Sequence, residues 1–185
     1  MRVITGSARG RNLAAPAGLE TRPTSDMTKG AVFSVLQMMI ENSDFLDLFA
    51  GSGQMGVEAL SRGARSATFV DNSGKAIAVV KQNLSVCGFG DRSKVYQMDS
   101  LGFIQNCSQK YDVIFLDPPY QKELIAAVLP HCAKCLKEEG IILCETEKNE
   151  ILPETPDGLE LVKEYRYGKA KITSFRRKED EVCSE

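Results

Sequence analysis

Four consecutive residues, Asp117-Pro118-Pro119-Tyr120, directly follow the apolar stretch Val113-Ile114-Phe115-Leu116. Two prolines fix φ twice and remove two N–H donors, and a residue before proline is held extended. We therefore expect a stiff corner that presents the Asp117 carboxylate and the Pro118 carbonyl to one point. Two acceptors at one point suit an –NH2 group, and Tyr120 supplies a flat face on which a base can stack. Proline pairs also simply terminate strands, but that use leaves the Asp and the Tyr unexplained.

Three glycines follow a second apolar stretch, in the run Asp47-Leu48-Phe49-Ala50-Gly51-Ser52-Gly53-Gln54-Met55-Gly56. Glycine permits a tight turn and the close approach of a ligand to the backbone. The helix expected after the turn offers unpaired N–H groups. The Gly-x-Gly-x-x-Gly spacing is also that of dinucleotide-binding turns, and a strand-to-helix turn has purely structural uses. At a switch point of an open α/β sheet, we interpret this turn as a cofactor loop.

Two further carboxylates end apolar stretches. Asp71 lies in Thr68-Phe69-Val70-Asp71-Asn72, eighteen residues after Gly53. At that place it can accept both hydroxyls of an adenosine ribose, or it can cap the next helix. Asp99, in Gln97-Met98-Asp99-Ser100, can accept an adenine amino group or merely cap a helix. The sequence leaves both pairs of roles open.

Alternating patterns predict the elements that position these residues. Short apolar runs alternate with helical patterns from Asp44 onward, which is typical of strand–helix–strand repeats with right-handed crossovers. Strands that are apolar on both sides indicate a mostly parallel, doubly wound sheet covered on both faces. The expected strands are 45–49, 66–70, 93–98, 111–116 and 140–145, followed by an antiparallel pair at 159–166 and 169–177. The expected helices are 54–62, 73–87, 100–107 and 121–137.

The N-terminal segment differs from the rest in its charge. Residues 2–15 contain two glycines and predict a small hairpin or extended arm. Residues 1–30 contain five basic and two acidic side chains, although the whole chain has a net charge of −2. A basic arm on an acidic body can bind phosphate locally, or it can simply solubilise the surface. A helix is expected after Asp26, with one buried stripe made by Met27, Ala31, Val32, Val35, Leu36 and Met39.

Length and composition exclude several classes of protein. With 185 residues, 43% apolar and 26% charged, we expect one globular unit: a basic arm at 1–24, a main domain at 25–178 and a charged tail at 179–185. No apolar N-terminal segment or long apolar run is present, so we expect no signal peptide and a cytoplasmic protein with free thiols. We expect no metal site, because Cys132 and Cys135 share a predicted helix as small core residues. Tyr165 and Tyr167 are interpreted as strand packing.

Read together, these motifs resemble a known family. DLFAGSG, FVD and DPPY, in this order, are similar to S-adenosylmethionine-dependent amino-methyltransferases. The additional GSARGR, TRPTSD and EALSRGA resemble the bacterial 16S ribosomal RNA guanine-N2 methyltransferases of the RsmD type, from Arg2 to about Arg177. The resemblance implies a Rossmann-like class I methyltransferase fold, with a seven-stranded sheet, helices on both faces and an N-terminal hairpin arm. It implies a 16S rRNA (guanine(966)-N(2))-methyltransferase-like activity on a small-subunit particle. It also implies a monomer that does not associate with membranes.

The resemblance also implies roles for individual residues. Asp117, Pro118 and Tyr120 would receive and stack the target base. RNA phosphates would be held by Arg2, Arg9, Arg11 and Lys29. S-adenosylmethionine would be bound by Arg22, Thr24, Asp47, Phe49, Ala50, Gly51, Ser52, Gly53, Asp71, Asn72, Asp99 and Ser100.

One departure from the family pattern lies after TRPT-x-D. The family has an Arg there and, slightly later, a Glu, whereas this chain has Met27 and Gly30 with Lys29 between them. The same corner could instead serve adenine N6, cytosine N4 or a protein glutamine amide. Two other classes stay open: a small NAD-binding oxidoreductase, which leaves DPPY unexplained, and an RNA-binding module without catalysis.

Overall fold

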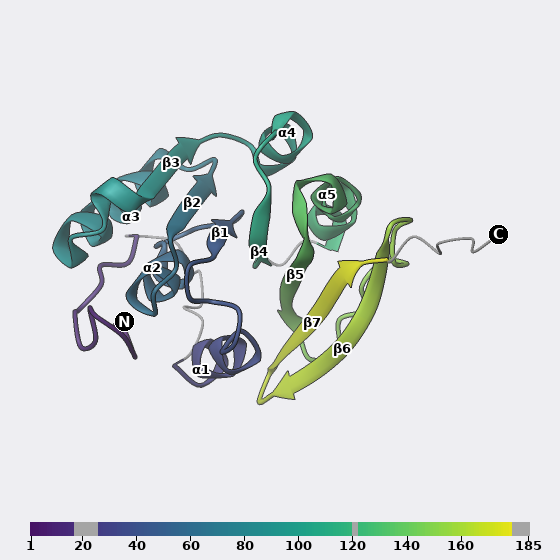
Figure 1. The fold of residues 1–185 in the computed structure, drawn as a ribbon, viewed down its shortest axis with the longest axis horizontal. Helices are drawn as coiled ribbons and strands as arrows, with labels where there is room; N and C mark the ends of the chain where they lie inside the picture. The colour runs from purple at the N-terminus through teal and green to yellow at the C-terminus, as the bar shows by residue number, and fades with distance from the viewer. Residues whose placement is uncertain (17–25, 120–121, 179–185) are drawn as a thin grey trace.

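Seven strands form one sheet in the order β3-β2-β1-β4-β5-β7-β6 (Figure 1). The structure, a computed structural model, describes residues 1–16, 26–119 and 122–178. The first five strands are mutually parallel, and β7 runs antiparallel to both β5 and β6. The strands are β1 (Asp44–Asp47), β2 (Ser66–Asp71), β3 (Ser93–Gln97), β4 (Tyr111–Leu116), β5 (Leu136–Glu147), β6 (Leu159–Tyr167) and β7 (Ala170–Arg177).

Helices cover both faces of the sheet, which confirms the predicted doubly wound architecture. One apolar core lies between the sheet and α1, α2 and α3, and a second lies under α4 and α5. Within the described part of the chain, no helix is long and apolar enough to cross a membrane. The helices are α1 (Asp26–Val35), α2 (Gln54–Ser61), α3 (Gly74–Cys87), the short 3-10 helix η1 (Gly90–Arg92), α4 (Ser100–Asn106) and α5 (Lys122–Cys135).

The structure corrects two details of the predicted elements. β5 is longer than the predicted 140–145 at both ends, because Leu136 pairs with Tyr111 of β4, and Thr146 and Glu147 pair with β7 after β4 has ended. Met27 is 69% exposed instead of buried in the stripe of α1. Phe33, which was not predicted, is buried instead and stacks on Phe45 with 6.4 Å between ring centroids.

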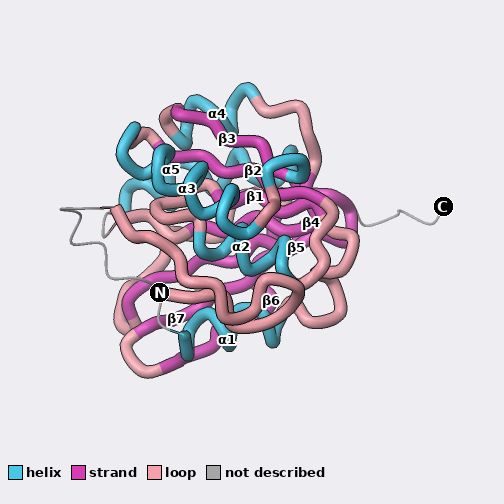
Figure 2. Tube along the Cα trace, turned by 90° about the vertical axis from the view of Figure 1, so that its left-hand side faces the viewer, coloured by secondary structure: helices cyan, strands magenta, loops and turns pink. Residues whose placement is uncertain are grey.

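The N-terminal arm is a hairpin, as predicted, and it is docked on α2. Val3 N donates to Arg11 O over 3.0 Å, and Gly10 N donates to Val3 O over 2.9 Å. Gly6 has a φ of +88°, and a Cβ there would lie 1.8 Å from Ser61 O. Only glycine therefore fits where the arm crosses the end of α2. The chain's N-terminal end lies beside α1 in both views (Figures 1 and 2).

A buried ion pair fastens this arm to the body. The Glu58 carboxylate accepts hydrogen bonds from Ile4 N at 2.8 Å and Thr5 N at 3.0 Å. Lys29 Nζ lies 4.0 Å from the same carboxylate and donates to Arg2 O over 2.7 Å. Both side chains are fully buried, and burial lowers the pKa of Lys29 while Glu58 opposes that shift. The prediction that Lys29 holds RNA phosphates is therefore wrong, because its ammonium group lies inside the protein.

Removing this carboxylate tests how the arm is held. We expect Glu58→Ala to lower the free energy of unfolding by about 3–5 kcal/mol, because Lys29 would keep a buried charge without its partner. Urea unfolding measures the change, and Glu138→Ala, at an exposed glutamate, is the control and should change it little. A loss below about 1 kcal/mol in Glu58→Ala would contradict this account.

Candidate active site

A cavity of about 560 Å³ lies at the carboxyl ends of β1, β2, β4 and β5. Ligands of open α/β sheets bind at this edge, where the strand order reverses between β1 and β4. The cavity joins the glycine turn after β1 to the Asp-Pro-Pro corner after β4. The predicted site residues that line it are Asp47, Phe49, Ala50, Gly51, Ser52, Asp71, Asn72, Asp99, Ser100, Asp117 and Pro118.

Four residues that were predicted to contact the cofactor or the target base are not among these lining residues. Arg22, Thr24 and Tyr120 lie outside the described residues. Gly53 is not among the lining residues, and it contributes through its backbone instead. Its φ of +75° and the φ of +54° at Gly51 let the chain reverse from β1 into α2.

Carboxylates on neighbouring strands hold the glycine turn in place. Asp71 Oδ2 accepts from Gly51 N over 2.8 Å, and Asp47 Oδ2 accepts from Gly56 N over 3.1 Å. The end of β2 thus supports the first glycine, and the end of β1 supports the third. The shape of the turn depends on two acidic side chains that also line the cavity.

The alternatives for Asp71 and Asp99 have different outcomes. Ser73, not Asp71, caps α3, because its hydroxyl accepts from Ala76 N at 3.3 Å. Asp71 Oδ1 accepts from Ser73 N instead, over 2.8 Å. Asp99 does cap α4, since its Oδ2 accepts from Gly102 N over 2.8 Å. Asp99 also lines the cavity. Its contact with a ligand therefore stays a prediction, beside its role as the cap of α4.

The electrostatics of the cavity favour a cation. Burial raises the pKa of Asp47 to about 7, and the nearby charges of Asp117 and Asp71 raise it further, against the hydrogen bond from Gly56. The charges of Asp71 on β2 and of Asp117 after β4 thus both disfavour a negative charge on Asp47. A bound positive charge would relieve this repulsion, whereas the pyrophosphate of a dinucleotide would add to it.

The far side of the cavity was not predicted from the sequence. The end of β5 and the loop after it supply four lining residues, and the β6–β7 hairpin supplies Tyr167 and Lys169. Tyr167 also stacks on Tyr165 with 6.5 Å between ring centroids, so its strand packing does not keep it from the cavity. Gly168 indicated the hairpin turn, but not that this turn lines the same cavity as the Asp-Pro-Pro corner. The β5 and loop residues are Glu145, Thr146, Glu147 and Glu150.

The N-terminal segments supply another wall that the sequence did not predict. Met1, Ala15 and Pro16 of the arm line the cavity, together with Met27 and Thr28 of α1. The position of Met27 on this wall accounts for its exposure. The family departure at Met27 thus lies directly at the site.

The three basic residues predicted to hold RNA, other than Lys29, are exposed on the arm. Arg2 has 66% of its side chain exposed and lies 3.5 Å from Asp26. Arg9 and Arg11 lie at the turn of the hairpin and on its second strand. The arm therefore presents its arginines to solvent while its backbone is docked on α2.

The cysteines of α5 and β5 are part of the core. Cys132, Cys135 and Cys144 are buried, and burial raises the pKa of each thiol. His131 Nε2 lies 3.3 Å from the Gln105 amide nitrogen. Over residues 1–16, 26–119 and 122–178, no group of His, Cys, Asp or Glu side chains could hold a metal ion.

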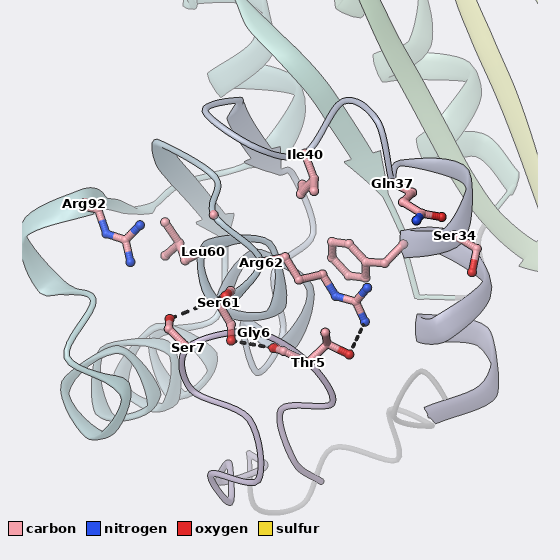
Figure 3. A pocket seen from close by; sticks show the side chains of 12 residues that line it. Thr5, Gly6, Ser7, Ser34, Gln37, Ile40, Leu60, Ser61, Arg62 and Arg92 are labelled. Carbon is pink, nitrogen blue, oxygen red and sulfur yellow. Dashed lines mark hydrogen bonds between the residues drawn. The ribbon is translucent and has the colours of Figure 1, made fainter.

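A second cavity, of about 690 Å³, lies near the amino ends of β1, β2 and β3 (Figure 3). Arg62 points into it, but this guanidinium is already bonded to Glu58 at 2.8 Å and to the Thr5 hydroxyl at 3.0 Å. The side chains of Ser61 and Ser7 hold the arm to α2 along the same wall. This second cavity therefore lies where the arm, α1 and α2 meet, at the opposite edge of the sheet from the glycine turn and the Asp-Pro-Pro corner.

The raised pKa of Asp47 predicts a pH dependence of stability. Between about pH 4 and 7 the folded state holds a proton that the unfolded state has lost, so this contribution is present at low pH and is lost as the pH rises. We expect Asp47→Asn, which retains the acceptor for Gly56 N, to gain about 2–4 kcal/mol relative to wild type between pH 4.5 and pH 8. Urea unfolding at both pH values measures this gain. A difference in stability between the two proteins that stays constant from pH 4.5 to pH 8 would contradict the assignment.

Comparisons with known proteins agree with this geometry. Residues 1–176 match the family described as Conserved hypothetical protein 95. The chain is 36% identical over 182 residues to ribosomal RNA small subunit methyltransferase D of Haemophilus influenzae, covering 95% of this chain and 92% of that protein. It is 30% identical over 179 residues to the Escherichia coli protein of the same name, covering 96% and 90%.

A solved structure shows the same fold. The Escherichia coli protein yhhF superposes with a TM-score of 0.86 and 30% identity, over 97% of this chain and 99% of that one. The strand order is the one typical of class I methyltransferases, which confirms the predicted fold class. From its sequence, its strand order and its glycine turn beside an Asp-Pro-Pro corner, this chain belongs to the Conserved hypothetical protein 95 family, among relatives of the RsmD type.

Proposed function

We propose that this protein is an S-adenosylmethionine-dependent ribosomal RNA methyltransferase that methylates the exocyclic N2 amine of a guanine in 16S rRNA. The observation that carries the proposal is the cavity shared by the glycine turn and the Asp-Pro-Pro corner. Relatives that span nearly the whole chain are named as small-subunit rRNA methyltransferases, which supports the RNA class. The substrate is a small-subunit particle in the cytoplasm, and the enzyme acts as a monomer.

The residues of the cavity suit this cofactor. S-adenosylmethionine carries a sulfonium and an ammonium group, and the crowded carboxylates of Asp47, Asp71 and Asp117 favour such a cation. When bound, it supplies an electrophilic methyl group. Asp47 would lie toward the amino end of the cofactor, Asp71 would hold the ribose, and Asp99 with the Ser100 backbone would contact the adenine. The remaining roles follow the family: Phe49, Ala50, Gly51, Ser52, Gly53 and Asn72 surround the cofactor, and Arg22 and Thr24 close over it.

The corner after β4 prepares the target amine. A guanine N2 amine is a weak nucleophile because its lone pair is delocalised into the ring. Asp117 and the Pro118 carbonyl accept one amine hydrogen each, which turns the lone pair toward the methyl donor. The carboxylate also stabilises the positive charge that develops on nitrogen, and the rigid corner holds the amine in line. Tyr120 stacks on the base, which must be unpaired or flipped out to enter the cavity.

A lysine on the far wall of the cavity supports guanine as the target base. With its N2 amine in the corner, guanine still offers a carbonyl acceptor, O6, whereas adenine with its one amine in the corner has no carbonyl to offer. Lys169 is exposed at the tip of the β6–β7 hairpin and lines the cavity, so its ammonium group can donate to that carbonyl. Backbone pairing of Lys148 N with Lys169 O over 2.9 Å fixes the hairpin tip against the loop after β5.

Substitution of the corner carboxylate tests the catalytic role. We expect Asp117→Ala to lower the rate of methyl transfer at least about a hundredfold, because the acceptor that polarises the amine is lost. Binding of S-adenosylhomocysteine, measured by calorimetry, should be kept, and this compound but not NADH should raise the melting temperature. Exposed Asp157→Ala is the matched control. Equal activity of Asp117→Ala and wild type would remove Asp117 from the mechanism.

Charge reversal on the arm tests the RNA contact. We expect the double variant Arg9→Glu/Arg11→Glu to weaken RNA binding and to reduce the slope of log K against log salt by about two, one unit for each lost phosphate contact. Arg176→Glu/Arg177→Glu, at the exposed end of β7, is a matched pair that should keep the slope. A salt slope unchanged by the arm substitutions would show that RNA binds elsewhere.

A further inference from the structure

One buried amide joins the arm to the glycine turn. Asn83, on α3, is 1% exposed. Its Oδ1 accepts from Ala14 N over 2.8 Å, and its Nδ2 donates to Ala14 O over 3.1 Å and to Ser52 O over 2.9 Å. The side chain therefore pairs with both backbone groups of Ala14 and uses its second N–H for the glycine turn. It links two segments that are far apart in the sequence.

Both linked segments line the cavity. Ser52 belongs to the glycine turn, and Ala15 and Pro16 follow directly after Ala14. A second contact runs in parallel, since Ser52 Oγ donates to Met1 Sδ over 3.4 Å and Met1 also lines the cavity. The two ends of the arm are themselves joined by Leu13 N, which donates to Met1 O over 3.0 Å. The whole base of the hairpin is thus held against the glycine turn.

We propose that Asn83 is a positioning residue for cofactor binding, which holds the base of the arm as one wall of the cofactor half of the cavity. The proposal rests on the proposed function for the identity of that cofactor. Asn83 itself does not line the cavity, so it acts through Ser52 and through the residues that follow Ala14.

The chemistry of the contact requires an amide at this position. An amide has one acceptor and two donors on a short, planar group, which matches one peptide unit and one further carbonyl. Aspartate retains the acceptor for Ala14 N but loses both donors. Alanine leaves Ala14 and Ser52 with backbone groups that have lost a buried partner, and such losses are costly.

The arm has a second, separate attachment, so loss of Asn83 should act locally. Ile4 and Thr5 are held by Glu58 on α2, on the other side of the hairpin from Ala14. Variants at Asn83 should therefore keep the arm docked at Glu58 while its base moves away from the glycine turn. The expected defect is in the cofactor wall and not in the fold.

The test measures S-adenosylhomocysteine affinity in Asn83→Ala and Asn83→Asp by titration calorimetry. We expect Kd to rise about tenfold or more in both variants, as expected for lost buried hydrogen bonds. With RNA substrate, KM for the cofactor should rise while kcat at saturating cofactor is kept. Hydrogen exchange should show Ala14 N protected in wild type and exchanging faster in the variants.

Two further variants separate positioning from a general loss of stability. Ser43→Ala removes a 2% exposed hydroxyl that donates to Ile40 O over 2.7 Å near the opposite edge of the sheet, and it should leave Kd unchanged. Ala14→Pro removes the backbone N–H that donates to Asn83 Oδ1, and it leaves the Asn83 side chain unchanged. It should raise Kd as the Asn83 variants do, so the proposal is tested even where Asn83→Ala fails to fold.

The outcomes distinguish this proposal from the proposed function. Wild-type affinity in folded Asn83 variants, or in Ala14→Pro, would overturn the positioning role and leave the methyltransferase proposal intact. A loss of kcat with unchanged KM for the cofactor would also overturn it. If wild-type protein bound no S-adenosylhomocysteine, the proposed function would fall, and this proposal with it.

Discussion

The chemistry of the site depends on three carboxyl groups that the fold brings to one edge of the sheet. β2, β1 and β4 are adjacent and parallel, so the side chains that end them, Asp71, Asp47 and Asp117, meet at the same cavity. The burial of Asp47 and the nearby charges of Asp117 and Asp71 disfavour a negative charge on Asp47 unless a cation is bound. Two of them also hold the glycine turn, so the shape of the turn and its charge preference have the same origin. A cationic methyl donor fits both the shape of the turn and its preference for positive charge.

The N-terminal arm belongs to this site more closely than its basic sequence suggests. Its backbone is held by Glu58 at one side and Asn83 at the other, so the hairpin is fixed to α2 and α3. Its exposed arginines face solvent, where RNA phosphates can reach them. In our proposals, one short segment contacts RNA at its turn and forms one wall of the cofactor site at its base. A rigid arm of this kind loses little conformational entropy when it binds.

Local patterns predicted the parts of the structure that local chemistry determines. The alternation of strands and helices, the glycine turn and the Asp-Pro-Pro corner each depend on a few neighbouring residues. The path of β5 beyond β4 was missed because it depends on pairing with β7, which is distant in sequence. Lys29 was assigned to RNA because the family resemblance implied it, and only the tertiary fold shows that Glu58 and Arg2 O enclose its ammonium group. Tyr167 and Lys169 were missed because the position of the β6–β7 turn at the cavity depends on long-range packing.

In the proposed reaction, the corner after β4 presents an exocyclic guanine amine to the methyl donor. The most direct measurement is transfer of tritium from methyl-labelled S-adenosylmethionine into small-subunit particles that lack the modification, followed by nucleoside analysis of the 16S rRNA. The account predicts label in N2-methylguanosine from wild-type enzyme. Label in N6-methyladenosine, in N4-methylcytidine or in ribosomal protein, or no transfer by protein that binds the cofactor, would contradict it.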